Sequence, residues 1–239
     1  MKALILGAGA VALLAGAAAV RPAPEIVVGR FVTRLSDREP AQRVNAIRAA
    51  ERLNGAIVAP GQIFSFNEAV VSWSRDQGYR RAPVSFSGQM VRAWGGGVCQ
   101  TSTALFNASL LAGLEIVERH AHHYAPNYVA PGRDAAVAFP NIDLRVKNNG
   151  REPLRLQAEA QGDRLVITWW GRTARPAATI STRMVSGRAP GTLRLGSGRV
   201  RVTNPGKPGF EVVTRRQVGD AVEVWHDNYA VMNRVELGR

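Results

Sequence analysis

The chain has 239 residues and a single cysteine, Cys99, which follows the three glycines 95–97. One cysteine cannot form a disulfide within its own chain, so it is either an ordinary buried residue or a thiol that does chemistry. The glycines allow a tight turn, and the stretch rich in Ala and Leu at 101–114 has the length and spacing of a helix. We therefore expect Cys99 near a helix N-terminus, where the helix dipole stabilises a thiolate.

Three of the four histidines lie close together in the sequence, at His120, His122 and His123. A predicted strand carries them, and on a strand positions 120 and 122 face one side and position 123 the other. A histidine beside Cys99 could accept the thiol proton, and the thiolate would then attack an acyl carbon. The sequence leaves open whether His120 or His122 is this base, or whether both simply face water.

The same histidines, together with an aspartate, would also suit zinc. We place this alternative below thiol chemistry because the ligands would be crowded and His226, the remaining histidine, is far away in the sequence. No metal and no cofactor is therefore predicted. Two aspartates precede or begin the strands predicted next, and either could orient the imidazole of the base: Asp134 and Asp143.

Residues around the start of the cysteine helix are predicted to bind the substrate. Backbone N–H groups there would hold an oxyanion, and Gln100 is a candidate for a further donor. The predicted substrate-binding residues are Trp94, Gly96, Gly97 and Arg133.

A mixture of helices and strands must position these residues. Besides the cysteine helix at 99–114, apolar residues at helical spacing predict an amphipathic helix that ends near residue 54. Residues 70–95 are predicted to form a loop. The predicted strands are 25–33, 63–67, 115–120, 135–139, 142–147, 154–160, 164–170, 210–218 and 222–225. The expected fold class is α+β, with the cysteine helix packed on one antiparallel β-sheet and a β-rich C-terminal extension.

The N-terminal residues 1–22 have the pattern of a secretory signal. A lysine at the start is followed by an apolar run and then by small residues, and the run is also close to the minimum length of a membrane span. We expect a signal peptide or a membrane anchor there, then a domain at 26–171 and the C-terminal extension at 172–239. The protein is therefore expected in the periplasm or cell envelope, with membrane contact only through this segment.

The charge of the chain is strongly positive, with 31 Lys and Arg against 18 Asp and Glu and a net charge of +13. The arginines are scattered along the chain and form no stripe interleaved with aromatic residues, so no nucleic-acid partner is expected. An anionic envelope surface, or simple solubility, accounts for such a charge. The sequence predicts no oligomeric state.

Around Cys99 the chain resembles the VanW family. The matching pieces are FSFN at 64–67, GGGVCQTST at 95–103, LLAGLEIVERHAH at 110–122 and PGRDA at 131–135. The resemblance extends from about residue 29 to residue 171, and thus makes the domain at 26–171 VanW-like. His123 and Tyr124 follow His122 where the family commonly has a small polar residue, so the choice of base stays open.

The family is named after an accessory gene of glycopeptide-resistance clusters, including vancomycin resistance, and some members are understood to be cysteine-dependent L,D-transpeptidases that cross-link peptidoglycan. The resemblance implies Cys99 as nucleophile, His120 or His122 as base, and peptidoglycan stem peptides as substrates. A carboxypeptidase or endopeptidase would differ only in the acceptor. The alternative class is a non-catalytic envelope protein that binds wall peptides or a partner enzyme, with Cys99 packed inside.

Overall fold

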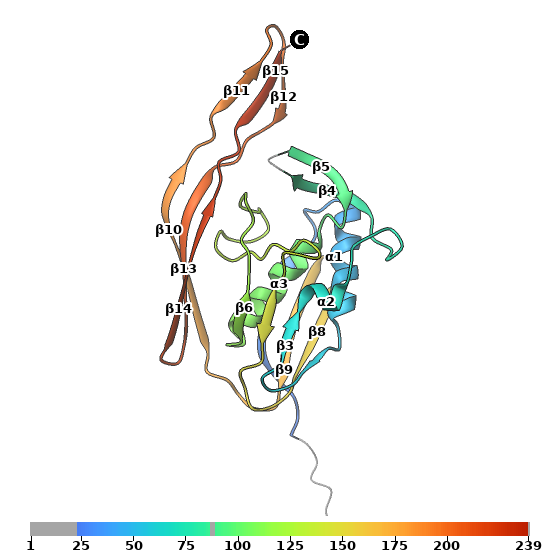
Figure 1. The fold of residues 1–239 in the computed structure, drawn as a ribbon, viewed down its shortest axis with the longest axis vertical. Coiled ribbons are helices and arrows are strands. Elements are labelled where there is room, and N and C mark those ends of the chain that lie inside the picture. The colour runs from blue at the N-terminus through green and yellow to red at the C-terminus, as the bar shows by residue number, and fades with distance from the viewer. Residues whose placement is uncertain (1–22, 87–88, 239) are drawn as a thin grey trace, which may run out of the picture.

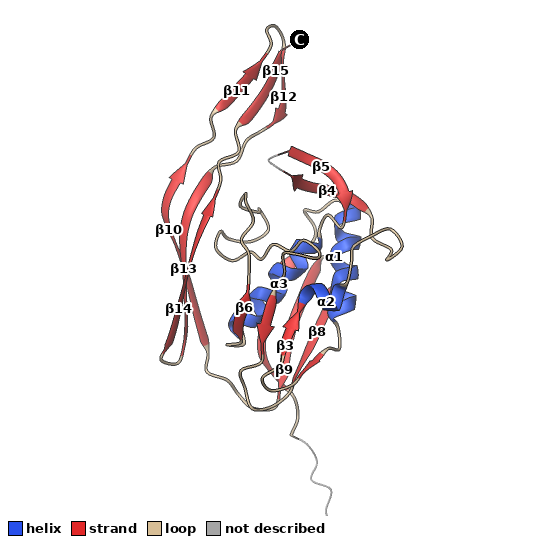
Figure 2. Ribbon diagram, viewed as in Figure 1, coloured by secondary structure: helices blue, strands red, loops and turns tan. Residues whose placement is uncertain are grey.

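The computed structural model describes residues 23–86 and 89–238. The segment expected to be a signal peptide or anchor, 1–22, lies outside the described residues. The fold is roughly α+β (Figure 2). Largely antiparallel sheets make up most of its regular structure, and the few helices accompany them. No helix within the two described ranges is long and apolar enough to cross a membrane.

A four-stranded antiparallel sheet is the base of the first part of the chain (Figure 1). In spatial order its strands are β1 (Ile26–Arg34), β9 (Arg164–Gly171), β8 (Leu154–Gln161) and β2 (Ile57–Val58). Helices α1 (Pro40–Leu53) and α3 (Val98–Leu111) pack on this sheet. The core fills the space between these elements, and its fully buried side chains include Trp169, Phe106 and Leu156.

The start of α1 follows from its sequence. Pro40 occupies the first turn, where its missing N–H would have no helical partner, and Glu39 and Gln42 cap each other's backbone in a capping box. The buried face of the helix consists largely of alanines. Because these side chains are small, α1 and α3 can approach each other closely.

A second sheet lies beside the first, and the expectation of a single antiparallel sheet is therefore wrong. Its strands are β3 (Ile63–Ser65), β7 (Arg145–Lys147) and β6 (Glu115–Glu118), and the short helix α2 (Phe66–Val70) follows β3. The chain leaves this sheet at Asn148, whose side-chain amide donates to the carbonyls of Val58 (2.9 Å) and Glu152 (2.8 Å). This fixed turn directs β8 into the other sheet.

The strand expected at 135–139 is also not formed. The structure has only isolated bridges there, from Ala136 to His120 and from Ala138 to Ile142. The reason is that the Ser102 hydroxyl donates to the Ala135 carbonyl (2.7 Å), so α3 rather than a neighbouring strand satisfies this backbone group.

Part of the loop expected at 70–95 is a hairpin, which corrects that prediction. Its strands are β4 (Arg81–Phe86) and β5 (Gln89–Trp94), and β4 contacts α1. Pro83 argues against a strand inside a sheet, but a two-stranded ribbon has only edge strands, where proline is tolerated.

The C-terminal part of the chain contains strands and no helix within 172–238 (Figure 1). One antiparallel sheet has the order β10 (Ala178–Arg188), β13 (Gly209–Val218) and β14 (Ala221–Tyr229). Another has the order β11 (Thr192–Leu195), β15 (Arg234–Gly238) and β12 (Val200–Asn204), with β11 parallel to β15.

This C-terminal part packs against α3 instead of extending the four-stranded sheet. The rings of Phe106 and Trp225 meet edge to face with centroids 6.5 Å apart, and Arg216 Nη1 donates to the Leu114 carbonyl (2.8 Å). Strand β14 thereby lies close to the residues around the histidines. The division of the chain at residue 171 stays a prediction.

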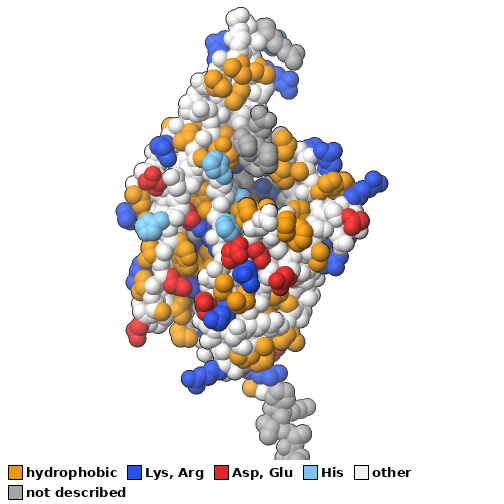
Figure 3. Space-filling model, viewed as in Figure 1, with side chains coloured by type: hydrophobic (Ala, Val, Ile, Leu, Met, Phe, Trp, Pro, Cys, Tyr) orange, Lys and Arg blue, Asp and Glu red, His pale blue; other side chains and the backbone are white. Residues whose placement is uncertain are grey.

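The positive charge is not gathered in one place on the face of the molecule that Figure 3 shows. Figure 3 shows Lys and Arg side chains over both parts of the chain on the visible face, without one large patch. Such a distribution favours solubility and weak attraction to anionic surfaces. The expected absence of a nucleic-acid partner stays a prediction.

Candidate active site

Cys99 is the second residue of α3, directly after a glycine turn. Gly97, the N-cap, has a φ of 110°, a conformation that favours glycine. A Cβ on Gly97 would lie 2.3 Å from the Gln42 carbonyl oxygen in α1. Because only glycine fits there, the sequence before Cys99 lets the start of α3 rest directly on α1.

The Cys99 thiol lies half-buried between the Val137 carbonyl and His122. Its Sγ donates to the Val137 carbonyl at 3.4 Å, and its other neighbour is His122. Burial alone would raise the pKa of Cys99, but the hydrogen bond and charge of His122 hold this pKa below its ordinary value. The surroundings of Cys99 therefore favour the thiolate.

His122 is held in one orientation by Asp134. The ring Nδ1 lies 2.6 Å from Asp134 Oδ2, and the same carboxylate oxygen accepts the backbone N–H of His122 at 2.7 Å. With Nδ1 donating to the carboxylate, Nε2 remains for the thiol. Burial would lower the pKa of His122, but its hydrogen bonds to Asp134 and then to Cys99 raise it to about 10. A thiolate–imidazolium pair is the expected resting state.

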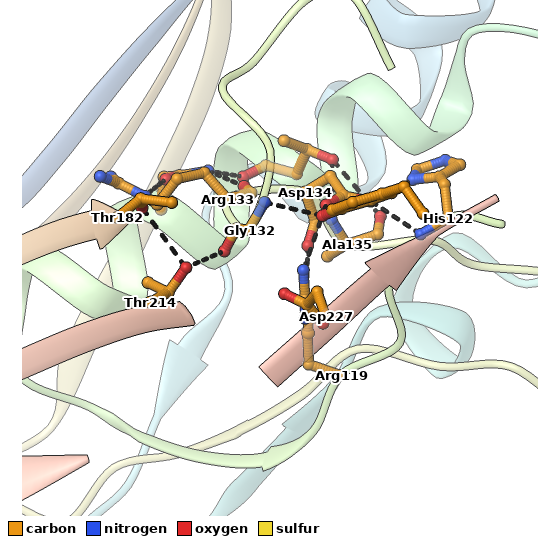
Figure 4. A network of polar contacts seen from close by, with 12 residues as sticks. Arg119, His122, Gly132, Arg133, Asp134, Ala135, Thr182, Thr214 and Asp227 are labelled. Carbon is orange, nitrogen blue, oxygen red and sulfur yellow. Dashed lines mark hydrogen bonds and ion pairs between the residues drawn. The ribbon is translucent and has the colours of Figure 1, made fainter. Parts of the chain in front are cut away.

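Asp134 is fully buried and is the centre of a polar network (Figure 4). Arg119 donates from Nη2 to its carboxylate (3.1 Å) and from Nε to its carbonyl (2.7 Å), and the Tyr229 hydroxyl donates to Oδ1. Arg119 also pairs with Asp227 on β14 (2.5 Å). The hydrogen bond and charge of His122, and then the charge of Arg119 and the Tyr229 hydroxyl, outweigh burial and keep the pKa of Asp134 below its ordinary value, so the carboxylate stays charged.

Polar residues of α3 hold the segment that carries Asp134. Ser102 donates to the Ala135 carbonyl (2.7 Å), Thr103 accepts the Ala135 N–H (3.0 Å), and Asn107 donates to the Arg133 carbonyl (2.7 Å). All three of these side chains are buried in the helix packing. The helix that bears Cys99 thus also fixes the segment that orients His122.

A pocket of about 210 Å³ opens beside the thiol, and we call it the Cys99 pocket. The first part of the chain lines it with the glycines 95–97 and with His122 and Tyr128, and the C-terminal part contributes Lys207. Because Cys99 is itself among the lining residues, the thiol borders this pocket.

Tyr128 adds a hydroxyl to this site. Its ring meets the His122 ring edge to face with centroids 6.4 Å apart, and its hydroxyl is buried without a hydrogen bond of ordinary geometry to any described residue. Burial, and then the charge of Cys99, raise the pKa of Tyr128 well above its ordinary value. The hydroxyl therefore keeps its proton.

The structure brings together some of the residues that the sequence suggests and separates others. Cys99, His122 and Asp134 form one cluster, and Gly96 and Gly97 line the Cys99 pocket.

His120 does not join this cluster. Strand β6 ends at Glu118, so the alternation expected for positions 120 and 122 does not continue to the histidines. The side chain of His120 is 46% exposed and its Nε2 contacts Glu118 (2.9 Å). The structure therefore places His122, and not His120, beside the thiol.

Asp143 lies in a different place as well. Its carboxylate accepts the Ser65 hydroxyl (2.5 Å) and the Asn67 N–H (2.9 Å) at the start of α2. It stabilises a helix end and does not contact the histidine of the cluster.

Three other candidates, all among the described residues, form no hydrogen bond from their side chains to the thiol, although Gln100 is among the residues that line the Cys99 pocket. The Gln100 amide donates to Thr33 Oγ1 (2.9 Å) and the Arg34 carbonyl (2.6 Å), which ties α3 to β1. Arg133 donates to Asn107 (2.6 Å). Trp94 is 40% exposed and does not line the Cys99 pocket.

Within the described residues no group of three or more His, Cys, Asp or Glu could hold a metal ion.

Sequence reasoning missed Arg119, Tyr128, Tyr229 and Asp227. Arg119 stands directly before the histidine cluster, but a lone arginine beside a histidine carries no clear signal. Tyr229 and Asp227 are about 100 positions away from Asp134 in the sequence, and only the packing of β14 brings them close. The one available sign that α3 holds a polar segment was the set of polar residues within its otherwise apolar sequence, such as Ser102, Thr103 and Asn107.

At neutral pH we expect the rate at which iodoacetamide alkylates Cys99 to be close to its maximum at high pH, because His122 already stabilises the thiolate. The rate should fall only as the pH is lowered through the depressed pKa of the thiol. Alkylation rates measured from about pH 5 to 9 test this, and His122→Gln should move the midpoint up toward the ordinary value of ~8.5. A wild-type midpoint at or above that value would contradict the ion pair.

Comparison with known proteins places this chain in a family. The model of the family described as "VanW like protein" matches residues 41–170, more than half of the chain, so the chain belongs to the VanW family. The matched range contains Cys99, His122 and Asp134.

Two curated relatives are similar to this chain. "Uncharacterized protein YoaR" of Bacillus subtilis (strain 168) is 36% identical over 141 residues, which cover 59% of this chain and 46% of that protein. "Vancomycin B-type resistance protein VanW" of Enterococcus faecalis (strain ATCC 700802 / V583) is 34% identical over 107 residues, which cover 42% of this chain and 38% of that protein. The chain thus spans less than half the length of these relatives.

Among solved structures, "Crystal structure of HP0197-G5" aligns at 16% identity with 26% of this chain and 97% of that chain. The TM-score of 0.15 is too low to indicate a shared fold.

Proposed function

We propose that this chain is an exported acyltransferase that modifies peptidoglycan stem peptides through a thioester on Cys99, in the manner of an L,D-transpeptidase. The observation that carries the proposal is the placement of His122 between the Cys99 thiol and the buried Asp134 carboxylate. A nucleophile, a base and a group that orients the base are the set that acyl transfer needs. Membership of the VanW family, and the resistance protein of that name, support a cell-wall substrate.

The first half-reaction forms the thioester. The Cys99 sulfur bonds to a peptide carbonyl carbon of the donor, and the tetrahedral intermediate then breaks its C–N bond. The leaving amine takes a proton from the His122 imidazolium, which becomes neutral. The products are a thioester on Cys99 and a released terminal amino acid.

The second half-reaction regenerates the site. An acceptor amine attacks the thioester carbon, His122 takes the proton of that amine, and the C–S bond breaks. A new amide bond, the thiolate and the imidazolium result. Water in place of the amine would give hydrolysis, with the same residues in the same roles.

The oxyanion of both intermediates needs donors near the start of α3. The N–H groups of Val98 and Gln100 already donate to the carbonyls of Gly95 (3.0 Å) and Gly97 (3.1 Å). The Cys99 N–H lies in the same first turn, where a helix supplies no acceptor, and it is our candidate for the first donor. The Tyr128 hydroxyl is the candidate for the second, because it is protonated and belongs to a residue that lines the Cys99 pocket.

The test is a product analysis. The purified chain is incubated with stem peptides from a peptidoglycan digest, and the peptides are followed by liquid chromatography and mass spectrometry. We expect cross-linked dimers from transfer, or shortened peptides from hydrolysis, and neither from Cys99→Ala. A wild-type chain that binds the peptides but forms neither product would contradict the enzyme and favour a binding protein of the envelope.

A further inference from the structure

Two cations from distant parts of the sequence line the Cys99 pocket. Arg38 follows β1 in the first part of the chain, and Lys207 lies between β12 and β13 in the C-terminal part. The described residues that line this pocket include no Asp and no Glu. The pocket beside the nucleophile is therefore positively charged.

Arg38 is held through its side chain, and Lys207 is held through its backbone. Arg38 Nη2 donates to Asn127 Oδ1 (2.9 Å), and its guanidinium carbon lies 4.7 Å from the centre of the Tyr128 ring. Lys207 pairs through its backbone with Met232, with N···O distances of 2.8 and 3.0 Å. The Arg38 contacts position its charge without neutralising it, and the Met232 contacts fix the backbone that carries Lys207.

Neither cation has an anionic partner among the described residues, whose ion pairs all involve other side chains. Asp37 is the carboxylate next to Arg38 and only partly offsets its charge. Burial lowers the pKa of Arg38, and burial followed by the charge of Arg38 lowers the pKa of Lys207. Two half-buried like charges without a counter-ion are stabilised when an anion binds between them.

We infer that Arg38 and Lys207 bind a free carboxylate of the substrate in the Cys99 pocket. The inference rests on the proposed function and specifies its substrate class: peptides whose carboxylate lies close to the bond that Cys99 attacks. The amino acid released in the first half-reaction is the terminal one, and its carboxylate is next to the scissile amide. Arginine and lysine are the side chains that recognise carboxylates. The pair would therefore favour attack on the last peptide bond of a chain and disfavour attack on internal peptide bonds.

The experiment compares two alkylating reagents of nearly equal size on the intact chain. Iodoacetate carries a carboxylate and iodoacetamide is neutral, so the ratio of their rates at Cys99 reports the charge of the pocket and cancels the thiolate fraction. We expect this ratio to be higher in the folded chain than in the chain unfolded in urea. Arg38→Gln and Lys207→Gln should each lower it about threefold to tenfold, and Arg201→Gln, an exposed arginine outside the pocket, should leave it unchanged.

Binding by the Cys99→Ala variant gives a second readout that needs no reactive thiol. Calorimetry with a peptide that ends in a D-amino acid should show tighter binding of the free acid than of its C-terminal amide, and Arg38→Gln with Lys207→Gln should remove the difference. Equal binding of acid and amide, or a reagent ratio that does not respond to these substitutions, would overturn the inference. Product formation in the assay above would then stand without it, whereas a charge preference without products would leave only a carboxylate-binding site and refute acyl transfer.

Discussion

Replacing His122 with alanine is expected to lower the rate of acyl transfer about 10²- to 10⁴-fold, the range that a positioned general acid–base supplies. The reason is that His122 both stabilises the Cys99 thiolate and protonates the leaving amine. Its side chain is 24% exposed, so its removal should leave the chain folded. The rate is measured as product formation from stem peptides, with the fold checked by circular dichroism.

His120→Ala is the matched control for this prediction. It removes the same side chain two residues earlier, where it contacts Glu118 and not the thiol. We expect an activity within about threefold of wild type, as for a surface substitution. A loss in His120→Ala as large as that in His122→Ala would show that the base has been assigned to the wrong histidine.

Asp134→Asn is expected to reduce both activity and stability. The amide cannot match the carboxylate as an acceptor for His122, and the corresponding change in a Ser–His–Asp triad lowers kcat by ~10⁴. It also leaves the buried Arg119 with Asp227 as its one remaining carboxylate. Breaking a buried ion pair costs about 3–5 kcal/mol, which denaturant unfolding would measure.

Asp143→Asn separates the two effects. It weakens the cap of α2 and should lower the free energy of unfolding by about 1–2 kcal/mol, while the rate per folded molecule stays near that of wild type. If Asp134→Asn were to behave like Asp143→Asn and lose only stability, the orienting role of Asp134 would be refuted.

The local part of the site follows from the sequence. A lone cysteine behind three glycines and before an apolar stretch indicates a thiol at a helix start, since the reasons are all local: glycine conformations, helical spacing and the helix dipole. The sequence also indicates Asp134 as one of two candidates for the orienting group, because this residue stands just before a predicted strand and close to the histidines.

The choice between the two histidines depends on where a strand ends, and strand ends are the least predictable feature of a sequence. Strand β6 stops at Glu118. Side-chain alternation extended beyond this point therefore wrongly places His120 and His122 on the same face. The sequence does not predict the hairpin of β4 and β5, because Pro83 argues against a strand. Proline is tolerated there because both strands are edge strands.

Long-range packing supplies what the sequence does not indicate. Tyr229 and Asp227 reach the Asp134 network from β14, and Lys207 reaches the Cys99 pocket from the loop before β13. The strand pattern of the C-terminal part predicts a β-rich extension but not the face that it covers. Its contribution to the site is therefore a result of the fold and has no counterpart in a local motif.

The central claim is that a thioester forms on Cys99, and the intact mass of the chain during turnover tests it most directly. The chain is mixed with stem peptides, quenched in acid within seconds to minutes, and weighed by mass spectrometry before and after proteolysis. We predict a mass gain equal to the donor peptide minus its released amino acid, located on the fragment that contains Cys99 and absent from Cys99→Ala. Products that accumulate without this adduct, or a mass gain that persists in Cys99→Ala, would contradict the account.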